Sequence, residues 1–434
     1  MFKIIIISSG VIAAVLAVLV FSGKLSLGSG SANTPSGQIE IWGTLPQSQM
    51  DNFLLQYNSQ TKTYRATYRF VKEENFSNAL VEALASGVGP DAIIAPYQKI
   101  LEQSSKLYPF PAASFSEKDY KDTYVNGTSI FWTNAGALAL PVAIEPLVLF
   151  FNRTLLAKHG VVSPPKYWGD INPLVPILTI TNPQGGFLES AIALGAYNNV
   201  PNAKDILSVI VNQLGQETVV KQIDNDGKSS YVVTANTPVK EGGDVLPLTS
   251  VLRYFMEFSD PTKNKYTWNQ FTPNAQDQFV AEKLAMYIGY YGEGKTIKER
   301  NQKIDFDTTY LPQTKDYNTF VTGMRLYGFA TLRVAKNPTV AFRVESDLAS
   351  IGWSTQISSL VGAVPPHKAY VTQTGVPEVL SRSNLVAKGW FDIKPQASSL
   401  LFEQMIRDVT SGKVDITDAV DSFVSRLQDK YTGQ

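Results

Sequence analysis

Short apolar runs alternate with amphipathic helical patterns over residues 39–95. Ile39–Trp42, Ala66–Val71 and Ala92–Ala95 have the length and composition of buried strands. Between them, Met50–Ser59 and Phe76–Ser86 repeat apolar residues three and four positions apart, as one face of a helix requires. A strand–helix–strand–helix–strand order is typical of a parallel sheet with helices on its faces. The sequence therefore predicts an α/β fold.

The same alternation resumes after Pro141. Leu147–Phe151 predicts a strand, and Arg153–His159 a helix that ends before Gly160. With 434 residues, the chain is longer than the roughly 250–300 residues that one hydrophobic core usually serves. We therefore expect two doubly wound lobes. Further helices are predicted at Phe187–Tyr197, Ala203–Leu214, Leu248–Phe258, Thr339–Ala349 and Ile416–Tyr431.

Charge and composition exclude several classes of function. Lys and Arg together number 38, as do Asp and Glu, so the net charge is zero, whereas nucleic-acid binding needs a surplus of positive charge. The chain has no cysteine and two histidines, which excludes a disulfide framework, a thiolate nucleophile and a three-histidine metal centre. We expect no cofactor and no metal.

The N-terminus carries an apolar run, Ile4–Phe21, flanked by Lys3 and Lys24. As a helix rising about 1.5 Å per residue, it approaches the thickness of a bilayer core. The alternatives are a cleaved signal peptide, a retained anchor and a buried core helix, and we favour the anchor. Small residues suited to cleavage come only at Gly30–Ala32. Residues 1–24 are thus a predicted transmembrane helix, and residues 25–37, rich in Gly and Ser, a flexible linker.

Gly289–Thr296 matches the phosphate-binding pattern GxxxxGK[ST]. No later apolar run ends in an aspartate that would hold the metal of a nucleotidase, and two tyrosines stand where the backbone must approach phosphate. We therefore disfavour nucleotide binding. A carboxylate pair for glycoside hydrolysis has no local pattern to support it. His159, in the last turn of a predicted helix, and His367, after two prolines, are interpreted as structural rather than catalytic.

Several aromatic residues stand where predicted strands end: Trp42, Tyr97, Tyr290 and Tyr291. In open parallel sheets, ligands bind beyond the carboxyl ends of the strands. An aromatic ring at that edge can stack on the apolar face of a ring-shaped ligand. These positions favour an uncharged ligand that contains a ring.

A series of short motifs follows in a characteristic order. Trp42-Gly43 closes the first strand, and Ala83–Gly87 leads into Pro90–Ile94. The later motifs are Leu149–Arg153, Leu156–Val161, Pro164-Pro165 before Trp168, Lys283–Met286, Val334–Asn337 and Ser411–Lys413. From about Ile39 to the C-terminus, this series resembles the extracellular solute-binding proteins of ABC importers, the family 1 group that includes sugar and maltose binders.

The resemblance implies a type II periplasmic-binding-protein fold whose two lobes are discontinuous in sequence. It places lobe 1 at residues 38–140 and 305–350, and lobe 2 at residues 141–304 and 351–434, with crossings near Pro141 and Phe306–Leu311. The implied function is capture of a solute by hinge closure and delivery to permease subunits, without catalysis. No cysteine is present for the family's usual lipid attachment, so the N-terminal helix would cross the cell membrane once and hold the soluble body on its extracytoplasmic side.

The resemblance also implies which side chains line the interlobe cleft. Sugar is the favoured ligand, and polyamines and metal chelates remain alternatives, since such ligands occur on similar scaffolds. A surface glycosidase and a P-loop nucleotidase are the remaining, less favoured, functions. The expected contact residues are Trp42, Tyr97, Glu145, Tyr290, Tyr291 and Tyr327.

Overall fold

The computed structural model describes residues 37–433, except 62–63, 225–228, 240–244 and 316–319. The expected membrane segment at 1–24, and all but the last residue of the linker at 25–37, lie outside this range. Within the described residues, no helix combines the length and apolar character needed to span a membrane.

The chain forms two compact units, each built from separate stretches of sequence. The chain passes from the first unit to the second within one strand, between Ala143 and Ile144, and returns within another, between Arg325 and Leu326. It passes to the second unit again between Val361 and Ala369. Among the described residues, the first unit contains the chain up to Ala143, Leu326–Val361 and Pro365–Lys368. The second contains Ile144–Arg325, Gly362–Val364 and the chain from Ala369 onward.

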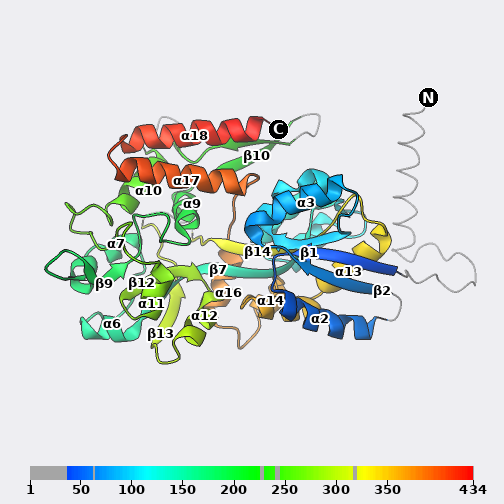
Figure 1. Cartoon of the computed structure of the whole chain (residues 1–434), viewed down its shortest axis with the longest axis horizontal. Coiled ribbons are helices and arrows are strands. Elements are labelled where there is room, and N and C mark those ends of the chain that lie inside the picture. Colours follow the sequence, from blue (N-terminus) through cyan, green and yellow to red (C-terminus); the bar gives the residue numbers. More distant parts are fainter. Residues whose placement is uncertain (1–36, 62–63, 225–228, 240–244, 316–319, 434) are drawn as a thin grey trace, which may run out of the picture. The chain divides into compact units, whose positions relative to one another are not determined.

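The first unit is built on a sheet in the order β2-β1-β3-β14. Strands β1 (Gly37–Gly43), β2 (Tyr64–Phe70) and β3 (Ala92–Pro96) are parallel, and β14 (Met324–Thr331) runs antiparallel to β3. The connections β1–β2 and β2–β3 lead in opposite directions along the sheet. Right-handed crossovers therefore place α2 (Gln47–Gln60) and α3 (Phe76–Ala85) on opposite faces (Figure 1).

Strand β3 shows why this sheet could be recognised from sequence. All of its residues, Ala92–Pro96, are buried, because both faces are covered, and such strands appear as continuous apolar runs. The remaining elements of the first unit are η1 (Glu73–Asn75), α4 (Tyr97–Glu102), η2 (Ser104–Lys106), β4 (Phe110–Pro111), α5 (Glu117–Thr123), η3 (Asn126–Phe131), β5 (Trp132–Thr133), β6 (Gly136–Ala137), α13 (Pro338–Leu348) and α14 (Ile351–Leu360).

The second unit has a mixed sheet in the order β7-β12-β9-β8, with β13 also paired to β7. Strand β12 (Leu284–Tyr290) is antiparallel to β7 (Leu140–Asn152) and parallel to β9 (Phe187–Ile192). Strand β8 (Ile180–Thr181) closes one edge, and β13 (Phe306–Tyr310) is antiparallel to β7. The sheet is therefore mixed rather than purely parallel.

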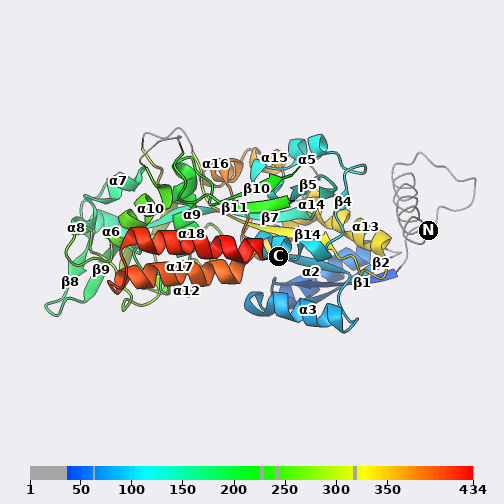
Figure 2. The same cartoon turned by 90° about the horizontal axis from the view of Figure 1, so that it is seen from above.

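Two long helices near the C-terminus, α17 (Pro395–Thr410) and α18 (Ile416–Thr432), run side by side (Figures 1 and 2). Asp415 accepts a hydrogen bond from the amide of Asp418 and so caps α18. The other elements of this unit are α6 (Arg153–Lys158), α7 (Trp168–Ile171), α8 (Val175–Leu178), α9 (Ala203–Gln213), β10 (Val219–Ile223), β11 (Ser229–Val233), α10 (Pro247–Met256), α11 (Ala275–Val280), α12 (Glu293–Arg300), α15 (Lys368–Val371) and α16 (Glu378–Val386).

Some predictions differ from the structure. Residues 351–361 and 365–368, predicted to belong to lobe 2, group with the first unit. Phe187–Tyr197, predicted as a helix, begins with strand β9, because Ser190 and Ile192 pair with β12. The segment 305–325, predicted to belong to lobe 1, groups with the second unit. Strand β13, which lies in this segment, pairs with residues 148–152 of β7, and this pairing holds it in the second unit.

Candidate functional site

The side chains expected to contact a ligand are shared between the two units. Each unit supplies three of them, on strands or directly after strand ends. Trp42, Tyr97 and Tyr327 belong to the first unit, and Glu145, Tyr290 and Tyr291 to the second.

In the first unit, the structure places these aromatics at one edge of the sheet. Tyr97 directly follows β3, and Tyr327 of β14 pairs with Pro96, so these two residues are neighbours. Trp42 lies near the end of β1, on the other side of β3. Its indole N–H donates to Glu40 Oε1 at 2.7 Å, and the Arg69 guanidinium lies 4.3 Å from the ring centroid. All three aromatics are buried.

In the second unit, Glu145 of β7 is the centre of a hydrogen-bonded group. Its side chain is almost fully buried, and each of its oxygens has a partner. Oε1 accepts from Arg325 Nη1 at 3.0 Å, and Oε2 accepts from the amide of Gly292 at 3.0 Å. The carboxylate thereby links β7 to the start of β14 and to the turn that follows β12.

Tyr290, the last residue of β12, lies against the same arginine. The Arg325 guanidinium is 4.0 Å from the centroid of the tyrosine ring, within the range of a cation–π interaction. The Tyr290 hydroxyl donates to Asp205 Oδ2 at 3.0 Å, near the start of α9. The structure therefore brings together Glu145 and Tyr290, two of the expected residues, with Arg325 between them.

Tyr291 occupies the turn after β12 and is only partly buried. Its amide donates to the carbonyl of Pro146 at 3.0 Å, which fixes the backbone of the turn against β7. Burial raises the pKa of the Tyr291 hydroxyl, and the nearby Asp307 carboxylate raises it further. The hydroxyl is therefore neutral near pH 7 and able to donate a hydrogen bond.

The turn that matches the phosphate-binding pattern is occupied by the protein's own carboxylates. Gly292 donates its amide to Glu145, and the amide of Tyr290 donates to Glu293 Oε1 at 3.0 Å. The other oxygen of Glu293 accepts from the Tyr287 hydroxyl at 2.6 Å. Backbone amides at a helix start commonly bind phosphate, but here two anions already hold them. Lys295 is exposed to solvent.

Burial dominates the electrostatics of this group. It raises the pKa of the Glu145 carboxyl above its ordinary value, although the Arg325 guanidinium and the Gly292 amide act in the opposite direction. Burial likewise raises the pKa of Asp205, against the effects of Lys204 and the Tyr290 hydroxyl. Such a group suits hydrogen bonding to a polar ligand held in a water-poor environment.

The residues that suggest chemistry elsewhere have structural partners. His159 Nε2 lies 2.7 Å from Glu189 Oε2, and His367 is buried against the ring of Tyr124. Burial lowers the pKa of His367 to about 4. Among residues 37–433, leaving out the gaps given above, no group of three or more His, Asp or Glu side chains could hold a metal ion.

Sequence reasoning missed Arg325, Asp205 and Glu293. Arg325 carries a signal that could have been used, because it is a charged residue at the start of the apolar run Met324–Thr331. A cation in that position needs a buried partner, and Glu145 interrupts the apolar run of β7 in the same way. Asp205 and Glu293 lie in the first turns of helices, where acidic residues are common. Their sequence context therefore gave no indication that they contact the site.

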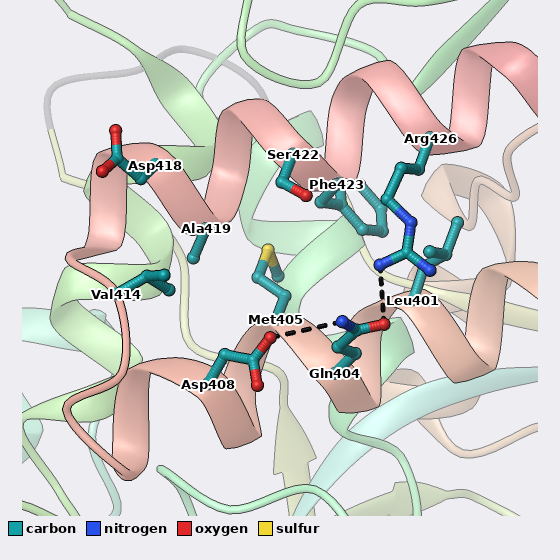
Figure 3. Close-up of a pocket in the computed structure, with 10 residues that line it drawn as sticks. All are labelled: Leu401, Gln404, Met405, Asp408, Val414, Asp418, Ala419, Ser422, Phe423 and Arg426. Carbon is teal, nitrogen blue, oxygen red and sulfur yellow. Dashed lines mark hydrogen bonds between the residues drawn. The ribbon is translucent and has the colours of Figure 1, made fainter.

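A small hollow lies between α17 and α18 (Figure 3). Its volume is about 60 Å³, room for a few water molecules but not for a sugar ring. Figure 3 shows Gln404 of α17 between one partner on each helix. Its side chain accepts from Arg426 Nη1 of α18 at 2.6 Å and donates to Asp408 of α17 at 3.3 Å. Met405 and Phe423 also line the hollow. We interpret it as a small gap in the packing of the two helices rather than as a ligand site.

Comparison with known proteins gives a family and a fold. Residues 56–343 match the sequence model of the family described as bacterial extracellular solute-binding protein. No curated protein sequence matches the chain significantly.

Several solved structures share the fold at low sequence identity. The cyclic alpha-maltosyl-1,6-maltose binding protein from Arthrobacter globiformis is 16% identical, with a TM-score of 0.72 over 92% of this chain and 100% of that chain. A cyclo/maltodextrin-binding protein complexed with maltotetraose is 14% identical, with a TM-score of 0.71 over 92% and 98%. The maltose/maltodextrin-binding domain from Bdellovibrio bacteriovorus bound to maltotriose is 13% identical, with a TM-score of 0.67 over 91% and 99%.

Proposed function

The chain belongs to the bacterial extracellular solute-binding proteins, and we propose that it captures a sugar or oligosaccharide and delivers it to the permease of an ABC importer. Capture requires contacts from both units. A ligand stabilises a closed form only through contacts that the open form does not make. Trp42, Tyr97 and Tyr327 would supply the contacts of one unit, and Glu145, Tyr290 and Tyr291 those of the other.

The observation that carries the proposal is the turn after β12. Tyr291 there is partly exposed, and the preceding Tyr290 lies against Arg325, whose side chain is 34% exposed and whose charge is balanced by Glu145. An aromatic face beside neutralised hydrogen-bonding groups suits an uncharged, hydroxyl-rich ring. The similar structures named above were solved as binding proteins for maltodextrins and related sugars, which supports this class of ligand.

The expected affinity is within reach of such contacts. A micromolar complex needs about −8 kcal/mol in total. Each hydrogen bond contributes roughly 0.5–1.5 kcal/mol, and each aromatic contact a comparable amount. Several bonds and two or three ring contacts, some from each unit, are therefore sufficient.

A thermal-shift screen of sugars, polyamines and metal chelates identifies the ligand class, because a ligand that prefers the native state raises Tm.

With the best sugar, we expect Tyr291→Ala and Tyr290→Ala to weaken binding about tenfold or more in calorimetry. Lys295→Ala, in the same turn but exposed, is the matched control and should bind normally. Unchanged affinity in both tyrosine variants would reject this site, and a shift only with polyamines or chelates would reject sugar.

The proposal includes a tether. Residues 4–21 would anchor the chain and keep the body near the permease, where a tether raises the effective concentration. We expect the full chain to sediment with membranes and a variant lacking residues 1–36 to be released in soluble form. If expression of the full-length gene instead gave a soluble protein of reduced mass, the N-terminal segment would be a cleaved leader.

A further inference from the structure

The second unit contains a cavity that is separate from the site at the end of β12. Its volume is about 540 Å³, within the roughly 300–1,000 Å³ typical of small-molecule sites. Its walls are the loop 195–199, the loop 259–271 and the C-terminal half of α17. We call it the α17 cavity. It shares no lining residue with the group around Glu145, and all of its lining residues lie in one unit.

Hydrogen bonds through one buried residue hold the two loops in place. The Asn199 side chain donates to the carbonyls of Asn269 at 2.8 Å and Thr272 at 2.6 Å, and it accepts from Trp268 Nε1 at 3.1 Å. The amide of Ala275 donates to the Asn199 carbonyl at 2.9 Å. The walls are therefore preformed, and a preformed site loses little free energy to ordering when a ligand binds.

Aromatic rings line the cavity from both loops. Tyr197 comes from the first loop and Tyr266 from the second, where its ring centroid lies 5.0 Å from that of Phe187. Phe271, at the rim, is 84% exposed. The Phe271 ring is therefore accessible to a ligand at the edge of the cavity, and a sugar ring offers a flat apolar face of suitable size.

The polar side chains of the cavity have no net charge. Arg407 Nη1 lies 3.4 Å from Glu403 Oε1, and the same oxygen accepts from Asn198 Nδ2 at 3.4 Å. Gln270 is exposed at the rim and adds a second amide. Amides both donate and accept, as sugar hydroxyls do. Because the single cation and the single anion pair with each other, the lining favours a neutral ligand.

We propose that the α17 cavity is a second saccharide site, which binds a neutral sugar chain within one unit. Binding there needs no movement between the units, so its affinity is independent of hinge closure. The cavity would keep a long glycan near the protein while the other site is empty or occupied. This assignment does not depend on the proposed function, because it stands on the lining of the cavity alone.

The test uses the full chain carrying Tyr291→Ala, which weakens binding at the other proposed site. Saturation-transfer NMR and a neutral glycan array, with maltotriose and mannotriose among the probes, should detect binding that survives this substitution. Adding Phe271→Ala should weaken it about tenfold or more. Val162→Ala, a fully exposed apolar residue elsewhere in the same unit, is the matched control and should change nothing.

Two results would overturn the assignment. The first is loss of all saccharide binding in Tyr291→Ala alone, and the second is binding that persists unchanged when Phe271→Ala is added. The outcome is distinguishable from failure of the proposed function, which would appear as unchanged affinity when Tyr290 and Tyr291 are replaced in an otherwise intact chain. Thermal melting verifies that each variant is folded.

Discussion

Glu345, on α13 in the first unit, is a buried carboxyl that takes no part in the candidate site. Its Oε2 accepts from the Thr331 hydroxyl at 2.7 Å, and its Oε1 has no hydrogen-bond partner among the described residues. Burial raises the pKa of this carboxyl from 4.5 to about 8. Glu345 is therefore mainly protonated in the folded protein at neutral pH.

This pKa predicts how stability depends on pH. The folded state binds a proton that the unfolded state has released between pH 4.5 and about 8, so the contribution of Glu345 is full below that range and is lost as the pH rises through it. Between about pH 7 and about pH 9, we expect the free energy of unfolding to fall by about 1 kcal/mol. Glu345→Gln should remove that decrease, as measured by urea unfolding.

His367 acts in the opposite direction and sets the conditions of this experiment. Its pKa is lowered from 6.5 to about 4 by burial, so its contribution is full above pH 6.5 and is lost as the pH falls through about 4. Measurements above neutral pH therefore exclude His367, and the comparison with Glu345→Gln isolates the contribution of Glu345. If the free energy of unfolding fell equally with pH in the wild type and in Glu345→Gln, the Glu345 carboxyl would not be protonated in the folded state.

At the scale of elements, the ion pair of Glu145 and Arg325 joins three segments: β7, the start of β14 and the turn after β12. Glu145 is 1% exposed and Arg325 is 34% exposed on the side chain in the folded unit. Breaking a buried pair from one side costs more than the pair contributes, because the remaining charge stays buried. The two partners should therefore respond unequally to substitution.

We expect Arg325→Met to destabilise the protein by roughly 2–4 kcal/mol, since it leaves a buried carboxylate without its cation. Glu145→Gln should cost less, about 1 kcal/mol, because the remaining guanidinium is partly hydrated. The double variant should be more stable than Arg325→Met alone, as measured by urea unfolding in a double-mutant cycle. Additive losses would show that the two side chains do not interact.

Elements with an unambiguous apolar pattern were predictable from sequence, and elements whose structure depends on a pairing partner were not. The apolar run of β3 and the three- and four-residue spacing of α18 each indicate one structure. The run that forms β9 fits a helix equally well, and only its pairing with β12 decides between them. The ion pair of Glu145 with Arg325 was not predicted for the same reason. The two residues are distant in sequence, and only the fold brings them together.

At the scale of the whole molecule, sequence patterns indicated two units but placed the return crossing too early. The prediction put it at Phe306–Leu311, whereas the chain returns within β14, after Arg325. A strand that stays within one unit and a strand that crosses to the other unit have the same local pattern of apolar residues. Only the pairing of β13 with β7 distinguishes them.

The proposed capture mechanism predicts a change in size. We expect a saturating sugar ligand to reduce the radius of gyration measured by small-angle X-ray scattering, because closure brings the two units around the ligand. Tyr291→Ala should reduce this response at the same sugar concentration, and Lys295→Ala should not. A scattering curve that is identical with and without a sugar shown to bind would contradict closure.

The placement of the Glu145–Arg325 pair has a consequence for where the backbone can bend. One partner comes two residues after the chain enters the second unit, and the other is the last residue before the chain leaves it. The pair clamps both passing strands on the same side of the crossing. In the proposed swing of the units, torsional change is therefore expected at Leu140–Ala143, directly after Arg325 and at the last passage between Val361 and Ala369. Glycine or proline introduced at the first two places would alter the swing without touching a ligand.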